Sequence, residues 1–268
     1  MSAKIKTACL GDKAMTYAVF GEGKKKKNLV ILPGLSVGSV TPAALAVEKQ
    51  FSLFCEDYTV YLCDRPVGAK TLRQMAEDTA ALLLSEGVAK AMIYGTSQGG
   101  MIAQFIAAAH PDRVEKLALA STCGESTDTL IETVDGWRRL ALAGDTLALA
   151  AAFGEYLYSP ATFAANRASL LAAADTYTQE NLDWFCRGVE ALHLPPFWEE
   201  TDKIAAAGIP TVVLGSEGDR VFGRDAVPAL ARRLGCPLVL YGEEYGHAVY
   251  DEAPDFVAKL FAFCQGEA

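Results

Sequence analysis

Residues 93–100 read Ile-Tyr-Gly-Thr-Ser-Gln-Gly-Gly, a serine flanked by glycines at the end of an apolar run. Gly95 and Gly99 stand two residues before and after Ser97, so the serine can occupy a strand-to-helix turn too tight for side chains at the flanking positions. The apolar residues 91–94 are typical of a buried strand, and the small and apolar residues after the turn are typical of a buried helix. A Gly-x-Ser-x-Gly sequence also recurs by chance in ordinary loops. Here strand, turn and helix stand in the order that exposes the serine hydroxyl.

The amide groups around this turn suit an oxygen that develops negative charge. The first N–H groups of a helix have no intrahelical acceptor, and the helix dipole favours an anion, so Gln98 N–H can serve as one donor. A second donor is expected from the loop after residues 28–32, where Gly34 lets the backbone approach closely and Leu35 can present its N–H. The Pro-Gly pair in that loop also fits a plain turn. Two donors beside a serine are what acyl transfer requires.

A serine is a poor nucleophile at neutral pH, so Ser97 needs a base beside it and an acid that orients the base. His247 is the candidate base, because it lies in a Tyr-Gly-His-Ala turn between the last expected strand and the last expected helix. Asp219 is the candidate acid, in the Gly-Ser-Glu-Gly-Asp-Arg loop that leaves the strand ending at Leu214. The three residues follow one another in the order Ser, Asp, His.

Alternatives exist for both partners of the serine. His247 can instead cap the start of the final helix, and Asp219 can be a turn residue that bonds to its own backbone. Glu217, two residues earlier on the same loop, is a rival acid if that loop is short. Asp128 and Glu125, after the preceding strand, are more distant alternatives.

The rest of the chain alternates expected strands and helices. Residues 5–20 predict two strands joined by a hairpin turn at Gly11-Asp12, and Gly87 is expected to cap a helix. Further strands are expected over 28–32, 58–63, 114–120, 211–215 and 238–241, and helices over 42–54, 72–85, 225–234 and 251–263. Apolar strands without polar alternation indicate an α/β fold, with a mostly parallel sheet covered by helices on both faces.

Between residues 124 and 200 the strand pattern stops, and Ala- and Leu-rich helical patterns replace it. We interpret 124–200 as a helical cap inserted into a core made of 1–123 and 201–268. The insert holds all three tryptophans, together with several Phe and Tyr residues: Trp137, Trp184, Trp198, Phe153, Tyr156, Tyr158, Phe163, Tyr177 and Phe185. Such aromatic residues can knit helices together or face a cleft. Those that face a cleft would favour a substrate with an apolar group.

Composition limits the partners of the chain. Its 268 residues are 51% hydrophobic and 21% charged, which fits one unit with a large core. The net charge of −9 opposes binding to nucleic acid or anionic lipid, because both require clustered Lys and Arg. The single basic run, residues 24–27, fits a solvated turn better than a targeting signal. No segment reaches the uncharged length that spans a bilayer, so we expect a cytoplasmic protein with a small-molecule substrate.

Cysteine and histidine usage points away from disulfides and metals. The seven cysteines are odd in number and form no Cys-x-x-Cys pair, which fits reduced thiols: Cys9, Cys55, Cys63, Cys123, Cys186, Cys236 and Cys264. The histidines are His110, His193 and His247, and none has a second ligand at metal-binding spacing. His110, beside a proline, is expected at a helix end without a catalytic role. No cofactor and no metal are predicted.

The chain resembles the α/β-hydrolase fold superfamily over nearly its full length. The resemblance is carried by five motifs in order: Pro33-Gly34-Leu35, Asp64-Arg65-Pro66, the elbow at 95–100, the loop ending at Asp219, and Gly246-His247. It implies that Ser97, Asp219 and His247 are nucleophile, acid and base, with Leu35 and Gln98 supplying the oxyanion hole. It also implies a helical cap where residues 124–200 lie.

Two departures from the family pattern matter. Many members have His-Gly where this chain has Pro33-Gly34, so the wall of the oxyanion loop differs. Family dehalogenases and epoxide hydrolases carry Asp at the elbow, and Ser97 argues against their chemistry.

The main hypothesis is a serine hydrolase of a small carboxylic ester or related acyl compound. C–C bond hydrolysis, lactone or thioester hydrolysis, acyl transfer, cofactor-free haloperoxidase chemistry and a non-catalytic ligand receptor remain alternatives.

Overall fold

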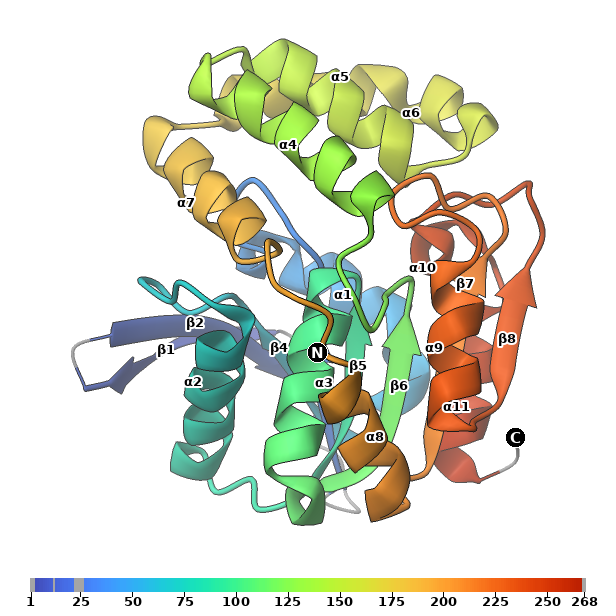
Figure 1. Cartoon of the computed structure of the whole chain (residues 1–268). Helices are drawn as coiled ribbons and strands as arrows, with labels where there is room; N and C mark the ends of the chain where they lie inside the picture. The colour runs from blue at the N-terminus through green and yellow to red at the C-terminus, as the bar shows by residue number, and fades with distance from the viewer. Residues whose placement is uncertain (1–2, 12, 22–26, 267–268) are drawn as a thin grey trace.

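Eight strands form one sheet in the computed structural model, which describes residues 3–11, 13–21 and 27–266. The strands are β1 (Lys4–Leu10), β2 (Lys13–Phe20), β3 (Lys27–Leu32), β4 (Tyr58–Cys63), β5 (Ala91–Thr96), β6 (Val114–Ala120), β7 (Thr211–Ser216) and β8 (Leu238–Tyr241). Their order across the sheet is β1-β2-β4-β3-β5-β6-β7-β8. Strands β3 to β8 run parallel, whereas the β1–β2 hairpin joins β4 antiparallel at one edge (Figure 1).

Helices cover both faces of this sheet, as the sequence predicts. One face carries α2 (Leu72–Ser85), α3 (Gln98–Ala109), α8 (Trp198–Ala207) and α9 (Ala226–Leu234), and the other carries α1 (Ala44–Gln50) and α11 (Phe256–Gln265) (Figure 1). The apolar run in strand β5 is explained by burial on both faces of the sheet. Ile93 packs into the first core, while Met92 and Tyr94 pack into the second. A strand buried on both faces has no polar position to alternate with.

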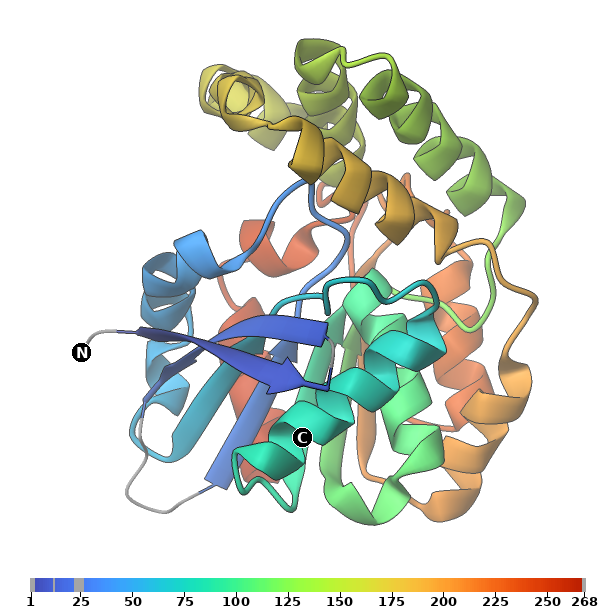
Figure 2. The same ribbon diagram turned by 90° about the vertical axis from the view of Figure 1, so that its left-hand side faces the viewer.

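Four helices lie together above the carboxyl ends of the parallel strands in both views (Figures 1 and 2). They are α4 (Asp128–Leu142), α5 (Thr146–Leu157), α6 (Pro160–Ala172) and α7 (Gln179–Glu190). We call α4–α7 the helical layer. The chain enters it after β6 and leaves it before α8, which begins at Trp198 and packs beside the sheet against α3 and α9. The division into core and cap stays a prediction.

Two predicted helices are wrong in their extent. The helix expected over 251–263 is broken into α10 (Val249–Glu252) and α11, because Pro254 removes an N–H donor and holds Ala253 in an extended conformation. The helix expected over 42–54 is a 3-10 turn (Thr41–Ala43), α1, and a second 3-10 turn (Ser52–Phe54). Residues three apart share one side of a 3-10 turn, so Phe51 and Phe54 lie together with ring centroids 5.7 Å apart.

The hairpin expected near the N-terminus is confirmed, with Lys4–Leu10 paired to Lys13–Phe20. Asp12 of its predicted turn and residues 24–26 of the lysine run lie outside the described residues. Within the described part, no helix combines the length and the hydropathy that crossing a bilayer demands. All seven cysteines are free, and six of them are at least partly buried.

Candidate active site

Ser97 lies in the turn between β5 and α3, with φ of 53° and ψ of −123°. This is a strained conformation for a residue that carries a Cβ, and such strain is concentrated at functional sites. The flanking glycines are required by contact. A Cβ at Gly95 would lie 2.5 Å from the carbonyl oxygen of Gly99, and a Cβ at Gly99 would overlap the carbonyl oxygen of Leu32. The tight strand-turn-helix element predicted from the sequence is therefore confirmed.

His247 and Asp219 form a buried pair at the same end of the sheet. Asp219 follows β7 and His247 follows β8, and Nδ1 of the imidazole lies 2.8 Å from Oδ2 of the carboxylate. The other carboxylate oxygen accepts the backbone N–H groups of Val221 at 2.8 Å and Phe222 at 3.0 Å. These two bonds fix the carboxylate, and the contact with Oδ2 orients the ring.

Ser97 and His247 line one small cavity beneath the helical layer. Its volume is about 30 Å³, which is room for little more than a water molecule. The rest of the lining is mainly apolar: Leu35, Leu130, Val134, Trp137, Phe153, Leu157, Leu192, Val221 and Tyr250. Burial raises the pKa of Tyr250 well above its ordinary value, so this phenol is neutral at physiological pH. No lysine, arginine or carboxylate side chain lines the cavity in the described part of the chain.

The two predicted oxyanion donors lie beside Ser97. Gly34 passes so close that a Cβ there would be 2.9 Å from the serine Cβ, and Leu35 lines the same cavity. Gln98 is the first residue of α3. Within residues 3–11, 13–21 and 27–266, neither the Leu35 N–H nor the Gln98 N–H donates to another group of the protein. Both amides are therefore available to an oxygen of a bound molecule.

The rival acids lie elsewhere. Glu217 is half-exposed and lies 3.6 Å from Arg224. Glu125 accepts the indole N–H of Trp198 at 3.3 Å, and Asp128 begins helix α4 at the surface. Among the described acidic residues, only Asp219 forms a hydrogen bond with His247.

The other two histidines form exposed pairs away from this cavity. His110 lies 3.0 Å from Glu77 and His193 lies 2.9 Å from Asp135. In the described residues, no group of three or more His, Cys, Asp and Glu side chains is arranged to hold a metal ion.

Two serines that were not predicted from the sequence form hydrogen bonds to the backbone of the His247 loop. The Ser121 hydroxyl donates to the His247 carbonyl at 2.6 Å, and the Ser216 hydroxyl donates to the Gly246 carbonyl at 2.7 Å. Ser121 has a φ of 44°, a second strained non-glycine residue. The available signal was a polar residue at the carboxyl end of each apolar strand, β6 and β7.

Glu252 also binds the backbone of this loop, a role that was not predicted from the sequence. One carboxylate oxygen accepts the Gly246 N–H at 2.6 Å, and the other accepts the N–H and hydroxyl of Ser159 at 3.0 and 2.6 Å. The Ala248 N–H also donates to the Leu157 carbonyl at 2.7 Å. The loop is thus tied to residues 157–159 of the helical layer. No local sequence pattern marks this role of Glu252, because its other partner, Ser159, lies 93 residues away in the chain.

Comparison with known proteins supports one family. The model of the alpha/beta hydrolase fold family matches residues 27–254. A protein of Azorhizobium caulinodans, named provisionally as the carbamate hydrolase RutD, is 23% identical over 259 residues, covering 95% of this chain and 96% of that protein.

Two solved structures share the fold. MGS-M2, an alpha/beta hydrolase enzyme from a Medee basin deep-sea metagenome library, has a TM-score of 0.85 and 23% identity, covering 97% of each chain. The enol-lactonase of Burkholderia xenovorans has a TM-score of 0.81 and 19% identity, covering 97% of this chain and all of the other. With the family model matching most of its length, the chain belongs to the alpha/beta hydrolase fold family.

Proposed function

We propose that this protein is a serine hydrolase that cleaves a small carboxylic ester or a related acyl compound through an acyl-enzyme on Ser97. The observation that carries the proposal is the buried pair of Asp219 and His247, whose imidazole lines the same cavity as Ser97. A strained serine, a base held by an acid, and two unused amide donors are the components of covalent acyl transfer.

The proposed reaction begins when the Ser97 hydroxyl attacks the acyl carbonyl. Because Nδ1 of His247 faces Asp219, Nε2 is the nitrogen that takes the serine proton and passes it to the leaving group. The N–H groups of Leu35 and Gln98 hold the oxyanion of the tetrahedral intermediate. Water, activated by the same imidazole, then releases the acid and restores Ser97.

The cavity lining favours a short, uncharged acyl group. Its volume of about 30 Å³ accommodates few heavy atoms, and apart from Ser97, His247 and Tyr250 its lining side chains are apolar. A carboxylate on the acyl group would enter this cavity without a charged partner, which carries a large desolvation cost. We propose that residues 124–200 act as a cap over the acyl group and that the protein works in the cytoplasm on a small molecule.

Hydrolysis of a lactone or a carbamate is the second candidate. It is supported by the printed names of an enol-lactonase and a carbamate hydrolase among the similar proteins. Both substrates present a carbonyl to the same serine, so the residue roles are unchanged. Assays with matched esters, lactones and carbamates of equal acyl size rank these activities by kcat/KM.

Labelling of Ser97 tests the main proposal. A fluorophosphonate probe followed by peptide mass spectrometry is expected to modify Ser97, and Ser97→Ala is expected to abolish turnover of p-nitrophenyl acetate and butyrate. Ser85→Ala, at the end of α2, is the control and should retain activity. Full activity in Ser97→Ala, or labelling at another residue, would exclude the mechanism. Retention of one ligand per chain without turnover would instead indicate a receptor.

A further inference from the structure

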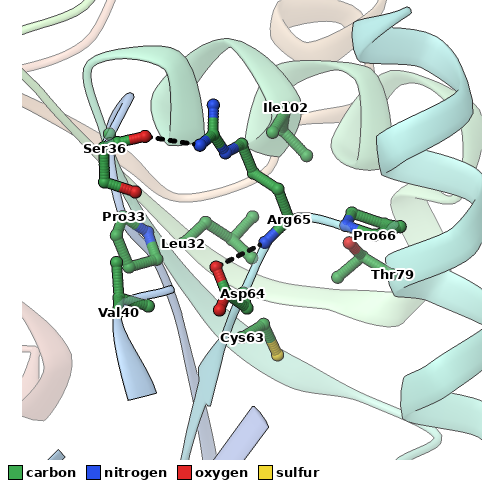
Figure 3. Close-up of a pocket in the computed structure, with 11 residues that line it drawn as sticks. Leu32, Pro33, Ser36, Val40, Cys63, Asp64, Arg65, Pro66, Thr79 and Ile102 are labelled. Atoms are coloured by element: carbon green, nitrogen blue, oxygen red, sulfur yellow. Dashed lines mark hydrogen bonds between the residues drawn. The ribbon is translucent and has the colours of Figure 1, made fainter. Parts of the chain in front are cut away.

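Arg65 is a buried cation that the proposed reaction does not use. It follows β4 in the Asp64-Arg65-Pro66 motif, and only 5% of its surface is exposed. Figure 3 shows its side chain reaching the loop after β3, where Nη2 donates to the Ser36 carbonyl at 2.6 Å. Nη1 donates to Oε1 of Gln98 at 3.4 Å. The guanidinium thus connects the backbone next to Leu35 with the side chain of Gln98, the two residues whose N–H groups are the proposed oxyanion donors.

Helix α7 of the helical layer closes over the same guanidinium. The ring of Trp184 lies 4.7 Å from Cζ of Arg65, a cation–π contact. The Gln98 side-chain amide donates to the Gly188 carbonyl at 2.6 Å. A Cβ at Gly188 would overlap Nη1 of Arg65 and lie 2.6 Å from Cδ1 of Leu35. Only glycine therefore lets α7 approach this closely.

The charge of Arg65 is poorly compensated for a buried group. No carboxylate in the described part of the chain lies within ion-pair distance of its guanidinium. One carboxylate oxygen of Asp64 accepts a hydrogen bond from the backbone N–H of Arg65 at 2.9 Å, not from the guanidinium (Figure 3). The positive charge of Arg187 lies nearby and further disfavours the charged form of Arg65. Burial lowers the pKa of Arg65 to about 10, so the guanidinium still carries its proton at neutral pH. Its Nε has no hydrogen-bond partner.

A neutral side chain would fill this space at lower desolvation cost. The planar guanidinium does what a neutral chain cannot, because it presents separate donors at fixed angles to a carbonyl and an amide oxygen. The acceptors belong to Ser36, next to Leu35, and to Gln98 itself.

We propose that Arg65 is a positioning residue for the oxyanion hole. It holds the backbone N–H groups of Leu35 and Gln98 at a fixed distance from each other and connects both residues to helix α7. The inference rests on the proposed acyl transfer at Ser97. Displaced donors weaken binding of the oxyanion more than binding of the substrate carbonyl, because charge develops on that oxygen only in the transition state. Loss of Arg65 therefore lowers kcat and leaves KM nearly unchanged.

Arg65→Lys tests this idea, since lysine keeps the charge but has one nitrogen in place of a fork. We expect kcat for p-nitrophenyl butyrate to fall about 10- to 100-fold, with KM within about threefold of the wild-type value. The rate of phosphonylation of Ser97 should fall by a similar factor.

Arg113→Lys is the matched control. Arg113 also donates Nη2 to a backbone carbonyl, that of Ala80 at 2.9 Å, and its buried Nε also lacks a partner. It lies beyond the opposite end of α3 from Gln98. We expect Arg113→Lys to lower Tm about as much as Arg65→Lys does, but to leave kcat at the wild-type value.

Gly188→Ala provides a second variant if Arg65→Lys does not fold. Its methyl group pushes against the guanidinium from α7, and the same loss of kcat at constant KM is expected. A wild-type kcat in Arg65→Lys or Gly188→Ala, or an equal loss of kcat in Arg113→Lys, would overturn the positioning role. If the wild-type protein neither turns over esters nor is labelled on Ser97, the proposed function fails instead, which the same assays reveal first.

Discussion

His247 and Asp219 face each other with Nδ1 and Oδ2 2.8 Å apart, and each side chain exposes only 1% of its surface. An amide in place of the carboxylate would present either a second N–H or a weaker acceptor to the ring. We expect Asp219→Asn to lower kcat for p-nitrophenyl butyrate by about 10⁴-fold, the loss typical of an amide at the acid position of such a triad. Steady-state kinetics at constant pH measure this loss.

Glu217→Gln is the control for that substitution. Glu217 lies near Arg224 at the surface, so its loss should leave kcat within about twofold of the wild-type value. If Glu217→Gln were the inactive variant and Asp219→Asn the active one, the acid would have to be reassigned.

Glu252 connects the His247 loop to the helical layer, and both of its carboxylate oxygens are used. Glutamine can replace only one of these oxygens, because its NH2 group would face an N–H donor. We expect Glu252→Gln to lower Tm by roughly 3–10 °C and kcat by about tenfold. Glu77→Gln, which removes an exposed carboxylate near His110, should change neither quantity. A wild-type kcat in Glu252→Gln would show that the loop keeps its place without the carboxylate.

Leu130 contributes to the wall of the Ser97 cavity and is buried. Truncation to alanine lengthens the space available to an acyl chain. We expect Leu130→Ala to raise the ratio of kcat/KM for hexanoate over butyrate esters by about tenfold, the effect of one or two methylene groups in an apolar pocket. Leu149→Ala removes an equally buried leucine of the helical layer that does not line the cavity. An equal shift in both variants would contradict a specific acyl pocket.

Asp64 predicts a dependence of stability on pH. Burial raises the pKa of its carboxyl group above the ordinary 3.8, although Ser39 and the Arg65 N–H donate to it. The folded state therefore holds the proton more tightly than the unfolded state. Ionisation of Asp64 therefore lowers the stability of the folded protein as pH rises from about 4 through the native pKa of this group. The Tm of Asp64→Asn relative to wild type should rise over this interval and then level off.

Asp202 gives the opposite sign and is the control for the Asp64 prediction. The side-chain hydrogen bond from Arg233 lowers the pKa of Asp202. Its stabilising effect is present above the ordinary pKa and is lost as pH falls through the native one. The Tm of Asp202→Asn relative to wild type should therefore decrease with rising pH. Thermal denaturation between about pH 2 and 7 covers the interval of each group, which lies below the ordinary pKa for Asp202 and above it for Asp64. A parallel pH trend in both variants would refute the assignment for Asp64.

Features with a local signature were predictable from the sequence. The strand runs and the glycine spacing around Ser97 form recognisable patterns within a few residues, although the contact that requires Gly99 is with the distant Leu32 carbonyl. His247 and Asp219 were found through their loops at the ends of expected strands. The break at Pro254 was also readable, since proline disfavours helical conformation in the residue before it.

The groups that hold the site in place had no such signature. Glu252 joins Ser159, and Arg65 joins Ser36, Gln98 and the ring of Trp184, across separations of 29 to more than 90 residues. These contacts depend on how the helical layer docks on the sheet. A single sequence carries no pattern for that docking, so a charged residue in a loop or short helix looks like any other.

The bonds from residues 157–159 to the His247 loop restrict the construction of chimeric enzymes. A transplanted helical segment would have to present a backbone carbonyl to the Ala248 N–H and an N-cap hydroxyl to Glu252. Its backbone would also have to pass as close to residue 246 as residues 157–159 do, where only glycine fits because a Cβ on Gly246 would lie 2.6 Å from the carbonyl carbon of Tyr158. Substrate preference in this chain is therefore better altered by single substitutions within α4 than by exchange of the whole segment.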